Sequence, residues 1–235
     1  MAYAAVTLST LQTRLNDRLE TSAFYTTAEL TLAINEALRV WNLYTGTWRR
    51  RVTHVLQPTS DNYFALPQTI VFPMRMEVNG TPMAKSSLTD LDNGQPGWEG
   101  QSIGDAGVPT SPQVWAPASL TLIAYWPRVV NATFTVTVDG VSATPVLSGS
   151  SDNIDLNEAR HNILLGYAKH YLNFKRGSAE LQQSGPALQA MLLAAAEENV
   201  AFRESSFFRW AMARDEKPRL PEHPAPQQGQ QDASR

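Results

Sequence analysis

Residues 26–46, TTAELTLAINEALRVWNLYTG, carry the strongest helical pattern in the chain. Thr26 and Glu29 have the spacing of a capping box, in which each side chain bonds the backbone amide of the other residue. The apolar stripe that follows is Leu30, Ile34, Ala37, Leu38 and Trp41. Gly46 suits the left-handed position that ends a helix. The pattern predicts an amphipathic helix that has to bury one face against a partner.

Three further helices are expected, and they lie towards the two ends of the chain. One starts at a capping pair, Ser9 and Gln12, and its stripe is Leu8, Leu11, Leu15 and Leu19. Another starts at Asp155 and Glu158, ends at Gly177, and has the stripe Leu156, Ala159, Ile163, Tyr167, Tyr171 and Phe174. The last starts at Pro186 and is expected to run to about Arg214. Neither end has enough helices to bury these stripes alone, so we expect residues 1–46 and 151–215 to form one helical bundle.

Residues 47–150 have the pattern of an inserted antiparallel β domain. Asn79-Gly80 is a strong hairpin signal, and Asp139-Gly140 predicts a second turn after the alternating strand at 134–138. Short strands and tight turns favour a small sandwich or barrel. Within this region, residues 86–117 form a long Gly- and Pro-rich segment that is either a functional loop or an ordered excursion.

Residues 216–235 contain four prolines and almost no large apolar side chain, a composition that cannot form a core. We therefore expect a disordered or extended C-terminal arm. The predicted fold class is α+β: a bundle of N- and C-terminal helices, an inserted β domain and this arm.

The composition excludes several classes of function. Nineteen basic and 22 acidic side chains give a net charge of −3, without the basic excess of a dedicated duplex-binding protein. The absence of cysteine excludes disulfide scaffolds and zinc ribbons. No apolar run has the length of a membrane span, and the N-terminus lacks the basic region of a signal peptide. Charged residues make up only 17%, which favours a surface partly covered by other subunits.

No catalytic, metal or cofactor motif is present. His161 and His170 fall on opposite faces of the predicted helix, so we interpret them as part of a solvated face. Residues 90–94 lack the glycine position of a calcium loop and are expected to form a turn. A carbohydrate-active enzyme would need paired carboxylates, for which the candidates are Asp90, Asp92, Glu99 and Asp105. We therefore expect a protein that is not an enzyme.

The candidate functional residues are instead interface residues. Arg49, Arg50 and Arg51 form either a charged strand edge or a contact to a neighbouring subunit. Trp98 and Trp115 lie in the long segment, where an intramolecular core is less available, so we interpret them as interface anchors. For Phe207, Phe208 and Trp210 we consider a place in an interface and a place in the chain's own core equally. Three more candidates lie in the arm: Pro218, Leu220 and Pro221.

Three stretches carry a resemblance to a known family. They are residues 26–46 quoted above, SLTDLD with PGW in residues 87–98, and the helical stretch from Ile163 to Lys175. In these stretches the chain resembles head-to-tail adaptor (connector) proteins of tailed phages, over roughly residues 8–215.

This resemblance implies a structural virion protein of the neck, assembled in the host cytoplasm without a membrane. It further implies a homo-oligomeric ring, usually twelvefold, that binds the portal protein, with an arm reaching into the portal. Genomic DNA would pass through the lumen with only transient contact. The partner of the β domain stays open among tail tube, nozzle and fibre proteins. The alternative is another neck or tail-completion protein.

Overall fold

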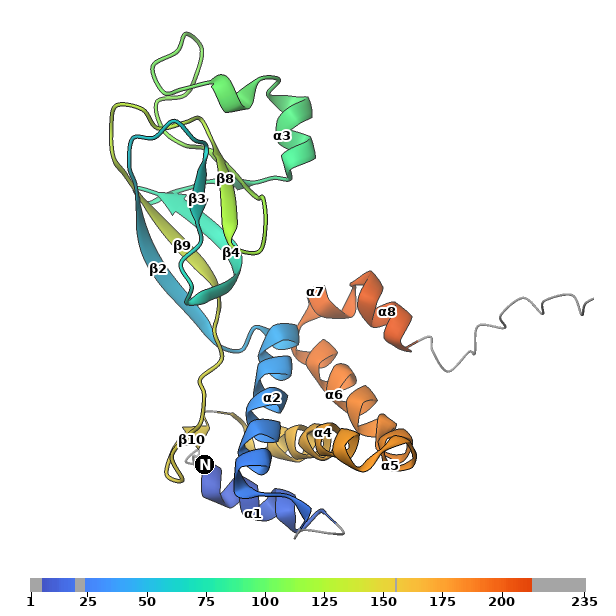
Figure 1. The fold of residues 1–235 in the computed structure, drawn as a ribbon. Helices are drawn as coiled ribbons and strands as arrows, with labels where there is room; N and C mark the ends of the chain where they lie inside the picture. Colours follow the sequence, from blue (N-terminus) through green and yellow to red (C-terminus); the bar gives the residue numbers. More distant parts are fainter. Residues whose placement is uncertain (1–5, 20–23, 155, 213–235) are drawn as a thin grey trace, which may run out of the picture.

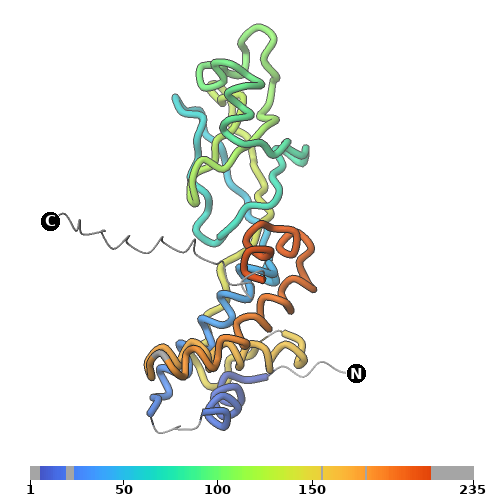
Figure 2. The backbone as a smooth tube through the Cα atoms, turned by 90° about the vertical axis from the view of Figure 1, so that its right-hand side faces the viewer, coloured from blue at the N-terminus to red at the C-terminus, as the bar shows by residue number. Residues whose placement is uncertain are grey.

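The computed structural model describes residues 6–19, 24–154 and 156–212. It has two lobes, a helical bundle and a β lobe, that follow one another along the long axis of the molecule (Figures 1 and 2). The bundle comprises α1 (Leu8–Asn16), α2 (Thr27–Thr45), α4 (Glu158–Arg176), α5 (Ser178–Gln183), α6 (Gly185–Glu198), α7 (Val200–Arg203) and α8 (Ser206–Met212).

Helices from both ends of the chain share one core in the bundle. The α2 residues Leu30, Ile34 and Trp41 are buried together with side chains of α1, α4 and α6. The principal partners are Leu11, Leu15, Leu164, Leu165, Ala168, Leu172, Met191, Leu192 and Ala195. The predicted α+β fold, with N- and C-terminal helices packed as one bundle, is therefore confirmed.

The limits of α2 follow the sequence signals, whereas those of α1 differ. Thr26 and Glu29 form the predicted capping box, and Gly46 adopts a left-handed φ of 63°. The cap of α1 is Thr7 rather than the predicted Ser9. A short strand fixes this start, because β1 (Val6–Thr7) pairs with β10 (Asn153–Ile154) immediately before the helix.

Helix α4 is rotated relative to the prediction. Its cap is Asn157, and Asp155 lies outside the described residues. Leu164, Ala168 and Leu172, which lie beside the predicted stripe, are buried. Ala159 and Phe174 of that stripe are exposed. The reason is that α4 packs against both α2 and α6, which centres its buried arc between these two neighbours.

The predicted continuous last helix is wrong, because Asn199 interrupts it. Asn199 has φ −127° and ψ 99°, which ends α6. Its side chain then accepts a bond from the Phe202 amide and donates one to the Tyr44 carbonyl at 2.6 Å. The tertiary contact to α2 thus holds the break between α6 and α7.

The β lobe consists of two four-stranded sheets. One has the order β2 (Arg49–Leu56), β9 (Phe134–Ser142), β4 (Ile70–Val78), β5 (Thr81–Pro82). The other has the order β3 (Tyr63–Ala65), β8 (Leu122–Trp126), β7 (Val114–Pro117), β6 (Ala84–Lys85). All pairs are antiparallel except β6 with β7. Side chains of both sheets form a shared core between them, which is the sandwich of the two predicted alternatives, sandwich or barrel.

The two predicted glycine turns have different outcomes. Asn79-Gly80 joins β4 and β5, with φ values of 47° and 83°, as predicted. Asp139-Gly140 is not a turn, because β9 runs straight through it between β2 and β4. A Cβ at Gly140 would lie 2.4 Å from the carbonyl oxygen of Phe72. This glycine therefore permits a close approach of two strands rather than a reversal of the chain.

The long segment is an ordered excursion that covers the outer face of the second sheet. It forms α3 (Leu88–Gly94) and a 3₁₀ turn, η2 (Trp98–Gly100), so the turn expected at residues 90–94 is part of a helix. Its apolar side chains pack on the outward-facing residues of β7 and β8 in a second small core: Leu91, Trp98, Ala116, Ala124 and Trp126. The strand β8 is apolar on both faces because both faces are covered.

Candidate functional site

The two histidines of α4 are buried and have structural partners. His161 and His170 are only 1% and 8% exposed, so their assignment to a solvated face was wrong. Nε2 of His161 donates to the Leu156 carbonyl at 3.1 Å, and Nδ1 of His170 lies 2.8 Å from the Ser184 hydroxyl. Burial lowers the pKa of both rings. His170 therefore joins α4 to the residue before α6, whereas His161 bonds the segment that leads into α4.

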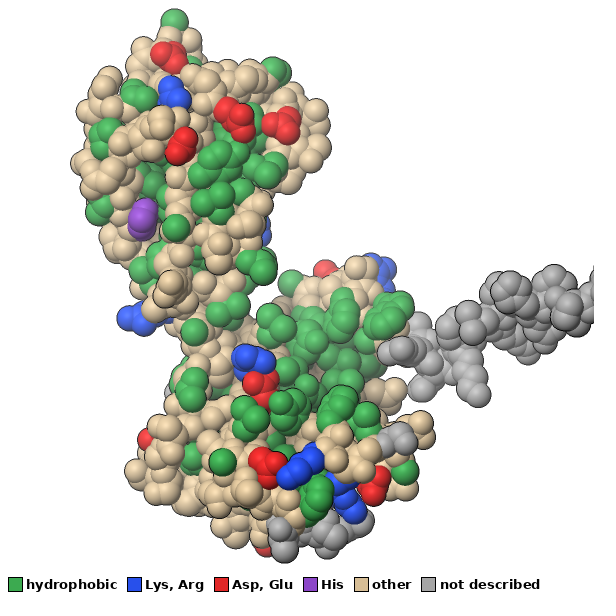
Figure 3. All heavy atoms as spheres, viewed as in Figure 1, with side chains coloured by type: hydrophobic (Ala, Val, Ile, Leu, Met, Phe, Trp, Pro, Cys, Tyr) green, Lys and Arg blue, Asp and Glu red, His purple; other side chains and the backbone are tan. Residues whose placement is uncertain are grey.

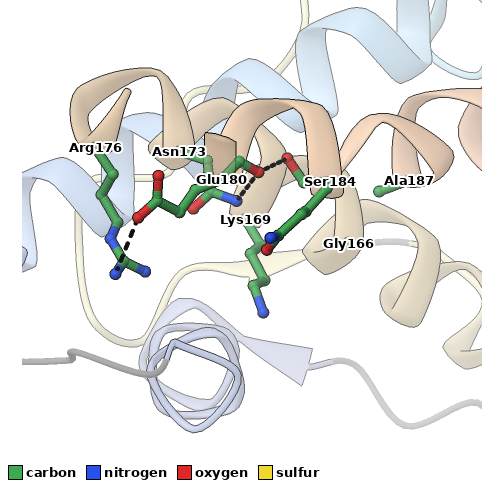
Figure 4. Close-up of a pocket in the computed structure, with 8 residues that line it drawn as sticks. Gly166, Lys169, Asn173, Arg176, Glu180, Ser184 and Ala187 are labelled. Atoms are coloured by element: carbon green, nitrogen blue, oxygen red, sulfur yellow. Dashed lines mark hydrogen bonds and ion pairs between the residues drawn. The ribbon is translucent and has the colours of Figure 1, made fainter. Parts of the chain in front are cut away.

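A polar pocket of about 320 Å³ lies between α4, α5 and α6 (Figure 4). Two of its charged groups pair with each other: Arg176 lies 3.5 Å from the Glu180 carboxylate. Asn173 and Ser184 both donate to the Glu180 carbonyl. Among the described residues no group of His, Asp and Glu side chains can hold a metal ion. The contacts that line the pocket thus join α4, α5 and α6 to one another.

The four carboxylates considered for an enzyme each have a structural partner in the β lobe. Asp92 accepts from the Trp98 indole at 2.8 Å, and Glu99 accepts from the Tyr63 hydroxyl at 3.0 Å. The other two make local bonds: Asp90 in the first turn of α3 accepts from the Ser87 hydroxyl, and Asp105 accepts from the Ser102 amide. Their role is to hold the excursion in place.

The arginine run lies on β2, at the edge of its sheet. All three side chains are exposed. Arg51 makes a two-pronged ion pair with Asp139 at 2.7 and 2.8 Å, which lowers the pKa of that carboxyl. Arg49 donates to the Gly46 carbonyl. These contacts agree with the interpretation as a charged edge, and a contact of the run with a neighbouring subunit stays a prediction.

Trp98 and Trp115 differ from what was expected of them. Their exposed fractions are 3% and 0%, so the chain supplies its own core for both. Trp115 faces the space between the sheets, whereas Trp98 packs on the outer face. Sequence reasoning missed that an irregular segment can fold onto a sheet. In this fold neither ring offers area to a partner.

The aromatic side chains of α8 divide between core and surface. Phe208 packs against the buried Phe202, with ring centroids 5.3 Å apart. Phe207 and Trp210 remain 44% and 58% exposed and line a groove between α6 and α8. The remaining candidates, Pro218, Leu220 and Pro221, lie outside the described residues.

A second apolar groove, of about 530 Å³, lies where the two lobes meet. Its exposed apolar side chains come from three elements: Leu32 and Leu43 of α2, Val71 of β4, and Val146 of the connection between the lobes. The sequence did contain a signal for it. Leu32 and Leu43 are eleven residues apart, which places them on one helix face away from the buried stripe.

No helix of the described residues is long and apolar enough to cross a membrane. A comparison with curated proteins gave no match. The family model described as SU10 adaptor protein matches residues 6–212, a range that includes both lobes. This match confirms the resemblance to head-to-tail adaptors. The chain belongs to the SU10 adaptor protein family and is a structural adaptor protein of a phage virion.

Proposed function

We propose that the protein forms a ring that joins the portal of the phage head to the tail, with the genome passing through its lumen. Membership of a phage adaptor family supports this role. By the same resemblance the ring is twelvefold. The balanced charge of the chain, a net of −3, suits a lumen that DNA slides past without binding.

The observation that carries the proposal is the division of the molecule into two lobes with separate cores. The bundle core is built mainly from helices, with Leu147 of the connection and Ile154 of β10 added, and the main β core contains strands from both sheets. The lobes lie at opposite ends of the long axis (Figures 1 and 2). A protein of this shape presents two different surfaces to two partners, as a joint between head and tail requires.

The connection between the lobes is held by polar contacts. The chain crosses it twice, and Asn42 of α2 bonds both crossings. Its amide donates to the Ser142 carbonyl and the Thr144 hydroxyl at 2.9 and 3.0 Å, and its oxygen accepts from the Trp48 amide at 3.0 Å. Asn35 forms two bonds of 2.9 Å with the backbone of Leu147. These bonds hold both crossings against α2, and in this proposal they set the angle at which the β lobe is presented.

In a ring each subunit contacts its neighbours through two different surfaces. The groove at the junction of the lobes, with Leu32, Leu43 and Val146, supplies one apolar surface of this kind. In this proposal the bundle binds the portal, residues 216–235 reach into it, and the β lobe contacts a tail component.

The test is electron microscopy of the purified chain mixed with the portal protein. We expect closed rings bound to the portal, and loss of binding when residues 216–235 are deleted. A chain with a scrambled 216–235 sequence controls for length and charge, and the helical circular dichroism should stay unchanged in both variants. A monomer that never associates with the portal contradicts the proposal. A ring that binds only tail components favours the alternative of a tail-completion protein.

A further inference from the structure

An aromatic groove, of about 440 Å³, lies between α6 and α8. Its main lining side chains are Tyr44, Pro186, Leu188, Leu192, Phe207 and Trp210. Tyr44 and Phe207 are stacked with ring centroids 5.8 Å apart, and Phe207 lies 6.2 Å from Trp210. Figure 3 shows apolar side chains gathered over this part of the bundle. The groove is thus a surface of aromatic and aliphatic faces.

The walls of the aromatic groove are anchored in the bundle core. Phe202 is only 9% exposed and packs against two other aromatic rings. Its ring centroid lies 4.6 Å from that of Tyr44 and 5.3 Å from that of Phe208. At the start of α8 the Phe208 amide donates a hydrogen bond to the Ser205 hydroxyl. The exposed faces of Phe207 and Trp210 are therefore presented by a helix with a fixed position, and the groove exists before any ligand arrives.

The chain that continues from α8 has a complementary pattern. Residues 218–224 read PRLPEHP, with prolines at every third position. A polyproline II helix has three residues per turn, so Pro218, Pro221 and Pro224 fall on one face. Proline-rich segments in this conformation bind grooves lined with aromatic side chains. Such a proline face matches the chemistry of the aromatic groove.

The distance along the chain permits this contact within one molecule. Residue 212, the last of α8, directly follows Ala211 of the groove lining. Residues 213–217 can span about 17 Å when extended. A short link of this kind gives an effective concentration in the millimolar range, which favours the segment of the same chain over that of another copy.

We propose that the aromatic groove is a binding site for the Pro218–Pro224 segment of the same chain, bound as a polyproline II helix. The arm is then stored on the bundle in the free protein and released on assembly. Binding of this segment takes place in the free chain, so the experiment below tests it separately from the proposed ring.

The test uses two nitroxide labels in the full-length chain, which contains no natural cysteine. Ala190→Cys places one on the exposed side of α6, and Ala225→Cys places the other beyond the proline segment. Double electron–electron resonance is measured after dilution with unlabelled chain, so only distances within one molecule are observed. We expect one narrow distance component. A broad distribution in the unmodified background contradicts the proposal.

Matched variants identify the contact. Replacing Pro218, Pro221 and Pro224 by alanine should remove the narrow component, whereas Pro226→Ala, off the three-residue register, should keep it. On the groove side Trp210→Ala should remove it. Leu193→Ala is the control, because this α6 side chain is 50% exposed and lies outside the groove lining. A narrow component that survives in the triple proline variant or in Trp210→Ala overturns the proposal, as does one that is lost on dilution with unlabelled chain.

Discussion

Two sets of aromatic residues give similar sequence signals and have opposite positions in the structure. Trp98 and Trp115 of the β lobe are almost completely buried, whereas Phe207 and Trp210 of the bundle are about half exposed. Both sets lie beside segments of weak periodicity. The difference comes from what each segment can cover: the excursion folds onto an apolar sheet face, and α8 lies at the margin of the bundle.

The comparison extends to the lobes that hold these residues. The β lobe closes its core with its own chain, including a second small core on the outer face of one sheet. The described part of the bundle borders apolar grooves, among them one beside α8 and one at the junction of the lobes. Both lobes nonetheless keep exposed apolar side chains, such as Phe72 and Leu120 in the β lobe and Leu43 and Trp210 in the bundle.

The largest expected effect is that of Trp115→Ala. The side chain is 0% exposed between the two sheets, so its removal should cost about 3–5 kcal/mol in the free energy of unfolding of the β lobe. Because the lobes have separate cores, the helical signal should unfold at an unchanged urea concentration. Hydrogen exchange of the β strands measures the stability of the β lobe, and the circular dichroism signal of the helices measures the unfolding of the bundle.

The control for this variant is Leu120→Ala in the same lobe. Leu120 is 87% exposed, so the change in stability should lie within about 0.5 kcal/mol. Equal destabilisation of both lobes by Trp115→Ala would contradict the idea that the cores are independent.

A smaller effect is expected from Asn42→Ala at the connection between the lobes. The variant leaves the part-buried Trp48 amide and Ser142 carbonyl without the Asn42 side chain as partner, which should cost about 1–3 kcal/mol. It should also widen the range of angles between the lobes, as measured by small-angle X-ray scattering. Thr144→Val removes only one of the three bonds and should have a weaker effect. An unchanged scattering profile for Asn42→Ala would show that packing alone sets the angle.

The smallest effect concerns the ion pair that joins α2 to α4. A bond of 2.7 Å from Lys175, together with the bonds from Thr26, lowers the pKa of Glu29 from its ordinary value of 4.5 to about 2. A lowered pKa stabilises the folded protein above the unfolded value and loses this contribution as the pH falls towards 2. The difference in melting temperature between the wild type and Glu29→Gln should therefore become smaller as the pH falls from 4.5 towards 2.

Thr26→Ser keeps the hydroxyl cap and should follow the wild-type pH profile. A melting difference for Glu29→Gln that stays constant from neutral pH to pH 2 would show that the carboxylate charge does not contribute to the stability of the bundle.

Local signals in the sequence predicted the elements that local contacts determine. The capping box at Thr26 and the left-handed Gly46 fix α2, and Asn79-Gly80 fixes a hairpin. Predictions failed where a distant part of the chain decides. Asn199 breaks the last helix through its bond to Tyr44, and Gly140 admits the backbone of Phe72 instead of forming a turn.

The candidate surfaces, too, were predictable only where local sequence determines them. The exposure of Phe207 and Trp210 was one of two open alternatives in the sequence, whereas the burial of Trp98 and Trp115 required knowledge of the sheet that the excursion covers. The groove at the junction of the lobes combines α2 with β4 and the connection, which lie far apart in sequence. Only its α2 residues, Leu32 and Leu43, had a readable pattern.

The most direct test of the central claim is cryo-electron microscopy of the chain bound to portal and tail components. The account predicts a closed ring in which every helical bundle lies against the portal and every β lobe points towards the tail. A ring that contacts the portal through its β lobes, or subunits that bind without contacting one another, would contradict it.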